Sequence, residues 1–153
     1  MTGSSDDDIL TLERQVCFAL AVASRGVIAL YRPLLEPLGL THPQYLVMLA
    51  LWERDPRTLR DLSEALDLEP ATLSPLVKRL EASGYVTRTR SAIDERALDV
   101  RLTESGRDLR SRAVEIPHRV VDRLNVPVED LEALRESLTR VIASTRNEPV
   151  RAG

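Results

Sequence analysis

The chain contains little of the chemistry on which enzymes and metal sites depend. Its 153 residues include one cysteine and two histidines, His42 and His118, which lie far apart in the sequence. Zinc sites need clustered ligands, and nucleotide sites need a glycine-rich loop such as GxGxxG or the P-loop. Neither pattern occurs in the sequence. The sequence therefore predicts no metal site and no bound cofactor, and it is not typical of an enzyme.

Signals for export or membrane insertion are also lacking. The N-terminus is acidic rather than basic, so it does not resemble a secretory leader. No uninterrupted apolar run reaches the roughly 18 residues that indicate a membrane span. A single cysteine excludes an intrachain disulfide, which fits a reducing compartment. We therefore expect a small cytoplasmic protein with no membrane contact.

Aromatic residues are scarce, and the charge is weakly acidic. Phenylalanine, tryptophan and tyrosine together number five, so leucine, valine and alanine must fill the core of what the length predicts to be one domain. A net charge of −3 is unusual for a nucleic-acid-binding protein. Six basic and four acidic residues nevertheless lie between Pro70 and Arg101, which makes that segment locally basic. Such a patch is compatible with DNA binding.

Periodic apolar residues predict helices in the first third of the chain. After a polar, mobile tail over residues 1–8, apolar residues recur at three- and four-residue steps over 9–30, and Pro33 marks the end of that helix. Thr41 then caps a helix that runs to about residue 54, and Gln44 completes a capping box.

Two further helices are predicted after the middle of the chain. Thr103 caps one that runs through Val114 and that Pro117 interrupts, and another runs over 127–144. Long apolar helix faces need a partner, and a second copy of the chain supplies one. We therefore expect residues 9–54 and 103–146 to form the helical dimerisation region of a two-fold homodimer.

The segment between these helical regions, residues 55–102, predicts a DNA-reading head. A helix over 58–66, which Thr58 caps, and a helix over 70–82 are followed by alternating strands over 85–89 and 98–102. This order is that of a winged helix-turn-helix, a device for reading duplex DNA. The fold class is therefore mainly α with a small β-wing, and the head forms one continuous domain with the helices around it.

In such a fold the second helix enters the major groove with its N-terminal half leading. Its polar residues are the candidate DNA contacts: Thr72, Ser74, Lys78 and Arg79. The hydroxyls suit base edges or phosphates, and the cations suit phosphate oxygens. For an isolated helix, such residues are more often only the solvated face of an amphipathic element.

The wing adds a second set of candidate contacts. The loop over 91–97 is too long for a tight two-residue hairpin, and Arg88, Arg90 and Arg96 lie on or beside it. An arginine at a ribbon tip can enter the narrow minor groove. We expect Asp94 to hold the Arg96 guanidinium through a bidentate pair, which could equally serve only to close the loop. The clustered arginines argue against a winged helix used only for protein contacts.

Three motifs carry a family resemblance. They are LxxLSEAL in the first head helix, ATLSPLVKRLExxGYV in the second, and IDERALDVRLTESG across the wing. With these motifs the sequence resembles the MarR family of bacterial transcriptional regulators over about residues 10–145. The resemblance implies a homodimer on a pseudopalindromic operator in double-stranded DNA. It usually implies a repressor that a signal releases.

The segments LERQVCFAL and YRPLLEPLGLTHPQYLVMLALWE look like the OhrR branch of that family, whose members sense organic hydroperoxides through one N-terminal cysteine. Cys17 falls at that position. The resemblance implies oxidation of the Cys17 thiolate to a sulfenic acid, which a low-molecular-weight thiol can cap.

The resemblance to this branch implies Tyr31 and His42 as the candidate hydrogen-bond donors to the sensing sulfur. Fourteen residues of one helix span about 21 Å, so Tyr31 can reach Cys17 only from the other subunit. The sequence departs from the branch's pattern, because Ala21 and His42 stand where tyrosines are often found.

Other functions stay open from the sequence. A lone cysteine on an apolar helix face is usually an inert core residue. Cys17 would then be structural in a MarR-type repressor released by a small aromatic or lipophilic ligand. A thiol peroxidase that uses Cys17 is disfavoured, because no second cysteine is present.

Overall fold

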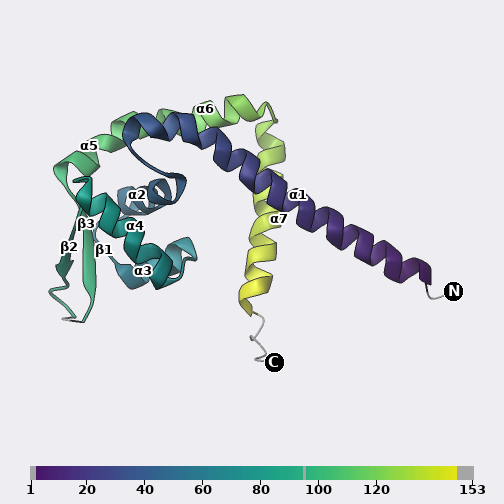
Figure 1. Cartoon of the computed structure of the whole chain (residues 1–153), viewed down its shortest axis with the longest axis horizontal. Helices are drawn as coiled ribbons and strands as arrows, with labels where there is room; N and C mark the ends of the chain where they lie inside the picture. The colour runs from purple at the N-terminus through teal and green to yellow at the C-terminus, as the bar shows by residue number, and fades with distance from the viewer. Residues whose placement is uncertain (1–2, 95, 148–153) are drawn as a thin grey trace. The chain divides into compact units, whose positions relative to one another are not determined.

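Helices make up most of the chain, and a small antiparallel sheet combines a strand before the helix-turn-helix with the two strands after it (Figure 1). The computed structural model describes residues 3–94 and 96–147. These residues divide into two compact units, one up to Ile116 and one from Pro117 onward. The elements of the chain, in order, are α1 (Gly3–Leu35), the 3-10 helix η1 (Glu36–Leu38), α2 (His42–Glu53), β1 (Arg57–Thr58), α3 (Leu59–Leu66), α4 (Pro70–Ala82), β2 (Val86–Arg90), β3 (Leu98–Leu102), α5 (Glu104–Ala113), α6 (Glu115–Leu124) and α7 (Val128–Asn147).

Threonine hydroxyls begin three of the helices, as the sequence predicts. Thr41 Oγ1 accepts the backbone N–H of Gln44, whose side chain accepts the Thr41 N–H in return, so the capping box at α2 is confirmed. Thr58 and Thr103 accept the N–H of the third residue of α3 and α5 in the same way. At the end of α4, Gly84 adopts φ 83°, the left-handed conformation that glycine takes most readily.

The sheet places β3 between β1 and β2. The β2–β3 hairpin forms the wing, with Val86 paired to Leu102 and Arg90 to Leu98. The third strand, β1, is a two-residue segment that pairs with Val100 and Asp99. It was not predicted from the sequence, because two residues are too few to show an alternating pattern.

Leucine and valine fill the core of the first unit. The most deeply buried side chains come from α2, α3, α4 and the wing, and they include Met48, Leu51, Leu62, Leu73 and Val100. Trp52 is half-buried, and its indole N–H donates to the Gly106 carbonyl at 2.9 Å, which ties α2 to α5. The head therefore has a continuous apolar core that holds α4 and the wing in place.

Helix α1 is longer at both ends than the sequence predicts. It begins at Gly3, so residues 3–8 of the predicted tail are helical; residues 1–2 lie outside the described residues. Asp6 in the first turn complements the helix dipole. The helix also passes through Pro33 to Leu35, although Pro33 has no N–H to donate within the helix.

The helix break before Pro117 lies within one residue of the predicted helix end at Val114. Helix α5 ends at Ala113, and α6 starts at Glu115 with Pro117 in its first turn. Proline is well tolerated there, because its missing N–H would have no partner in the helix. Residues 148–153, where the sequence predicts a frayed end, lie outside the described residues.

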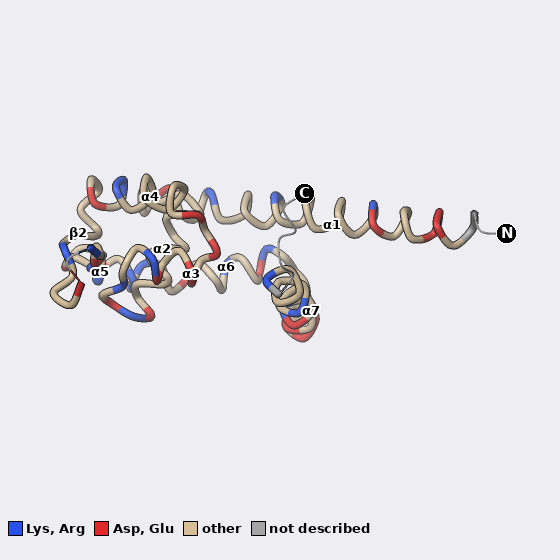
Figure 2. Tube along the Cα trace, turned by 90° about the horizontal axis from the view of Figure 1, so that it is seen from below, with Lys and Arg blue, Asp and Glu red and all other residues tan. Residues whose placement is uncertain are grey.

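Helix α1 is strongly apolar on average, although the sequence contains no long uninterrupted apolar run. An 18-residue window between Ser5 and Leu38 has a mean hydropathy of 1.4, so by length and composition alone this span is a candidate for crossing a membrane. Figure 2 shows long stretches of α1 without charged residues. The sequence predicts no membrane span. Length and composition are weak grounds against that prediction, because core helices of soluble proteins meet the same criterion.

Candidate nucleic-acid interface and thiol site

Helix α4 presents the four polar residues that the sequence singles out on its exposed face. Its buried face consists of Leu73, Leu76, Val77 and Leu80. The exposed positions between them include the predicted contacts Thr72, Ser74, Lys78 and Arg79. The buried face packs on α2 and α3, so the position of the polar face is set by the core. Figure 2 shows basic residues along α4 and near β2.

The turn between α3 and α4 is held by hydrogen bonds of its own. Asp67 takes a left-handed conformation, with φ 53°. The Ser63 hydroxyl donates to the Leu68 carbonyl across the turn. These contacts fix the angle at which α4 leaves α3, which a helix-turn-helix needs.

A network of short hydrogen bonds shapes the wing loop. The Ser91 N–H donates to the Ala97 carbonyl at 2.9 Å, and the Ala97 N–H donates to the Asp94 carbonyl at 3.0 Å. The Ser91 hydroxyl oxygen accepts the N–H groups of Ile93 and Asp94. Hydrogen bonds therefore connect the two sides of the loop.

Asp94 contacts the backbone of Arg96 and not, as the sequence predicts, its side chain. An Asp94 carboxylate oxygen accepts the backbone N–H of Arg96 at 3.0 Å, where a pair with the guanidinium was expected. Asp94 caps its own turn because an aspartate side chain readily bonds the backbone two residues on. The Arg96 side chain is exposed, as is that of Arg90 at the end of β2. Glu95 lies outside the described residues.

Arg88 lies at the base of the wing, away from its tip. Its guanidinium donates to Glu81 at 3.1 Å, and its backbone N–H donates to the other oxygen of the same carboxylate at 3.0 Å. These hydrogen bonds lower the pKa of Glu81. The Arg88 Nε atom is buried and has no hydrogen-bond partner within the described part of the chain. Arg88 thus joins β2 to the end of α4. Of the three candidate wing arginines, Arg90 and Arg96 are those whose side chains are exposed.

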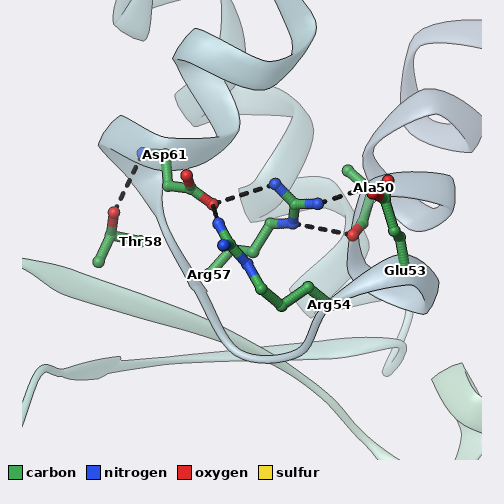
Figure 3. Close-up of polar contacts among 6 residues, drawn as sticks. All are labelled: Ala50, Glu53, Arg54, Arg57, Thr58 and Asp61. Atoms are coloured by element: carbon green, nitrogen blue, oxygen red, sulfur yellow. Dashed lines mark hydrogen bonds and ion pairs between the residues drawn. The ribbon is translucent and has the colours of Figure 1, made fainter.

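A cluster around Arg57 was missed in the sequence (Figure 3). Only 8% of the Arg57 side chain is exposed. Its Nε donates to the Ala50 carbonyl at 2.9 Å, and its Nη1 donates to Asp61 at 3.1 Å. Glu53 approaches at 3.6 Å, and Arg54 donates to the same Asp61 oxygen at 2.6 Å. The cluster joins the last turn of α2 to β1 and α3.

Asp61 is the common acceptor of this cluster. Its pKa is lowered chiefly by the hydrogen bond from Arg54, with Arg57 contributing in the same direction. The four-residue spacing of Arg57 and Asp61 could have indicated an ion pair. It could not have indicated that the arginine is buried, because the burial depends on the unpredicted strand β1.

Cys17 lies on the exposed surface of α1 in the single chain. The helix is continuous from Gly3 to Leu35, so Cys17 and Tyr31 are about 21 Å apart along its axis. Cys17, Ser24 and Tyr31 follow one another at seven-residue steps and lie on one stripe of the helix.

Tyr31 and His42 meet within one chain. Their ring centroids are 5.0 Å apart in an edge-to-face arrangement, and Tyr31 lies 5.7 Å from Tyr45. Burial raises the pKa of Tyr31 and lowers that of His42, which favours the neutral form of both rings. Tyr45, which the sequence analysis passed over, is buried beside them. The structure thus brings together two of the three predicted sensing residues and leaves Cys17 apart from them.

Within residues 3–94 and 96–147, no group of three or more histidine, cysteine, aspartate or glutamate side chains is arranged to hold a metal ion.

The helix-turn-helix with its hairpin defines a winged-helix protein. A family model described as the transcriptional regulator SarA/Rot matches residues 29–112. The chain belongs to this family of MarR-like winged-helix transcriptional regulators, and it is a regulator of the OhrR and SarZ type.

Individual relatives give the same result. The organic hydroperoxide resistance transcriptional regulator of Bacillus subtilis is 42% identical over 131 residues, which cover 86% of this chain and 89% of that protein. Reduced AbfR bound to DNA is similar in structure, with a TM-score of 0.78, 32% identity, and coverage of 93% of this chain and 99% of that one. A disulfide-formed AbfR matches with a TM-score of 0.64 and 31% identity over 96% of this chain and all of that one. AbfR is a protein of Staphylococcus epidermidis.

Proposed function

We propose that this regulator is a homodimeric repressor that binds a pseudopalindromic operator and is released when an organic hydroperoxide oxidises Cys17. The observation that carries the proposal is the placement of Cys17 on α1. It is exposed in the single chain, and it lies two heptads before Tyr31 on the same stripe of the helix; Tyr31 in turn contacts His42 of α2.

The DNA-binding step rests on α4 and the wing. Thr72 and Ser74 lie on the exposed N-terminal half of α4, where a recognition helix meets base edges. Lys78 and Arg79 follow one turn later, at the spacing for phosphate contacts. Reduced AbfR, which shares this fold, was solved bound to DNA.

The dimer rests on the exposed apolar surface of α1. Large hydrophobic side chains are exposed along the helix in the single chain: Ile9, Leu10, Leu12, Val16, Phe18, Leu20, Val22 and Ile28. A patch of this extent on a soluble protein marks an interface. A second copy of the chain offers a matching apolar surface about a two-fold axis.

Such an axis accounts for the spacing of the sensing residues. If two α1 helices cross antiparallel at Ser24, each Cys17 faces the partner's Tyr31, because both lie seven residues from the axis. The two Cys17 residues are then about 21 Å apart along the helices, too far for a disulfide between them. A small thiol must therefore supply the second sulfur.

The chemistry follows from these positions. The Cys17 thiolate attacks the terminal oxygen of the hydroperoxide, the O–O bond breaks, and an alcohol leaves after taking up a proton. The resulting sulfenic acid condenses with a low-molecular-weight thiol to a mixed disulfide and water. The neutral Tyr31 and His42 rings of the partner can donate hydrogen bonds to the sulfur and its new oxygen.

A path from this site to the DNA-binding head runs along α2. His42 is the first residue of α2, and the last turn of the same helix is bonded to Arg57. Arg57 lies on β1, which pairs with wing strand β3, and bonds Asp61 at the start of α3. In the proposed dimer, a mixed disulfide at Cys17 adds bulk beside the partner's His42. A resulting shift of α2 would change the placement of the head.

Operator gel shifts with wild type and Cys17→Ser test this proposal. Both proteins are reduced first and then treated with cumene hydroperoxide and a small thiol. Release of the wild type with retention of Cys17→Ser supports the proposal. Equal behaviour of the two proteins contradicts it and favours a repressor released by an aromatic or lipophilic ligand.

A further inference from the structure

The tip of the wing carries an isoleucine that has no role in the fold. Ile93 is 98% exposed, more than any other large hydrophobic side chain in the described part of the chain. Water surrounds this side chain on nearly all sides, so it contributes almost nothing to the core.

The position of Ile93 is nevertheless well defined. Its backbone N–H donates to the Ser91 hydroxyl at 3.2 Å, and the adjoining Asp94–Ala97 turn closes the loop. A loop held by such hydrogen bonds presents its tip in one orientation and loses little conformational freedom on binding.

The exposed cations on either side of Ile93 indicate what the wing tip contacts. Arg90 and Arg96 each lie three residues away with exposed side chains, whereas a carboxylate oxygen of the adjoining Asp94 accepts the Arg96 backbone N–H. The minor groove has the complementary construction, since phosphates line its edges and apolar sugar faces form its walls. Isoleucine is among the apolar side chains that proteins insert there.

From this arrangement we infer that Ile93 enters the minor groove beside each half-site and packs against the deoxyribose walls, while the flanking arginines contact the phosphates. The inference rests on the proposed binding to operator DNA. It makes Ile93 a specificity-determining residue, because an apolar tip senses the width of the groove and thereby its A·T content.

The test starts with an in vitro selection of the DNA sequences that the protein binds. The full-length wild type selects duplexes from a random-sequence library, and the best duplex becomes the probe. If no duplex is enriched, the proposed DNA-binding function fails, and that failure is distinct from a failure of the inference. Affinities of four proteins are then measured over a range of salt: wild type, Ile93→Ser, Ile93→Leu and Ala92→Ser.

Ile93→Ser is expected to lose about 5- to 10-fold in affinity, the size expected for exposing part of one isoleucine side chain. Its salt dependence is expected to match the wild type, because no phosphate contact is lost. Ile93→Leu, which keeps an apolar tip, and Ala92→Ser, the control on the same loop, should stay within about 2-fold of the wild type, because neither removes the buried contact.

Three results would overturn the inference. One is an unchanged affinity of Ile93→Ser. Another is equal weakening by Ile93→Leu, since an apolar side chain at the tip would then not be enough to keep the affinity. The third is a reduced salt slope for Ile93→Ser, which would assign the effect to displaced arginines. Hydroxyl-radical footprints give an independent readout, because Ile93→Ser should lose protection of the flanking minor groove only.

Discussion

Replacing Asp61 by alanine should destabilise the head, because it removes the main acceptor of a buried arginine. Arg57 would keep its bond to the Ala50 carbonyl and a 3.6 Å approach to Glu53, which is largely exposed. Apart from these contacts, the guanidinium charge would have no partner in a site where only 8% of the Arg57 side chain is exposed. Breaking a fully buried ion pair costs about 3–5 kcal/mol.

The cost at this site should be smaller, for two reasons. A third of the Asp61 side chain is exposed, so water can enter when the carboxylate is removed. The Arg54 contact contributes little, because 63% of that side chain is exposed and exposed pairs are worth about 0–1 kcal/mol. We therefore expect Asp61→Ala to lower the free energy of unfolding by about 2–3 kcal/mol.

Urea denaturation of three matched variants measures this. Arg54→Ala should cost less than about 1 kcal/mol, as an exposed pair does. Arg57→Met should cost less than Asp61→Ala, because it removes the buried charge together with its need for a partner. A loss below about 1 kcal/mol for Asp61→Ala, or an equal loss for Arg54→Ala, would refute the reasoning.

The pH dependence gives a second readout of the same cluster. The pKa of Asp61 is lowered in the folded chain, so the folded carboxylate holds its charge at a pH where the unfolded one is protonated. The stabilisation is therefore present above the ordinary carboxyl pKa of 3.8 and is lost as the pH falls through the lower folded value. Asp61→Asn should lack this acid-dependent loss.

Three further outcomes follow from the structure. Gly106→Ala should destabilise by about 2–4 kcal/mol in thermal unfolding, because an added Cβ would lie 2.1 Å from the backbone oxygen of Tyr85; a loss within error would contradict that contact. Arg96→Ala should weaken operator binding by about 1–3 kcal/mol, and unchanged affinity would remove Arg96 from the interface. Burial lowers the pKa of His42, so the unfolded chain takes up this proton first and stability should fall as the pH drops below 6.5; the same fall in His42→Phe would exclude His42 as the cause.

Local signals allowed much of the fold to be predicted from the sequence. Thr41 with Gln44, and Thr103 before α5, begin helices through contacts within four residues, and such contacts can be recognised without a tertiary structure. The polar residues Thr72, Ser74, Lys78 and Arg79 were likewise recognised from the sequence as one face of α4, and its buried face consists of other residues.

Features that depend on distant contacts were missed. Strand β1 exists because β3 lies beside it, and the burial of Arg57 follows from that pairing. The Asp94–Arg96 contact was predicted between side chains, but a backbone N–H two residues away was a nearer donor. The meeting of Tyr31 with Tyr45 depends on the packing of α1 on α2.

Part of the candidate site depends on a second copy of the chain. Within one chain α1 keeps Cys17 about 21 Å from Tyr31, so the sensing arrangement is a property of the proposed dimer. The apolar surface of α1, the seven-residue spacing and the exposed thiol all belong to that one proposal.

The most direct measurement follows Cys17 and operator binding in the same sample. Reduced protein is titrated with cumene hydroperoxide in the presence of a small thiol, and intact mass and fluorescence anisotropy of labelled operator are read at each step. The account predicts that operator binding falls as the mixed disulfide at Cys17 accumulates, and that it returns when a reductant removes the adduct. Complete modification of Cys17 with unchanged operator binding would contradict it.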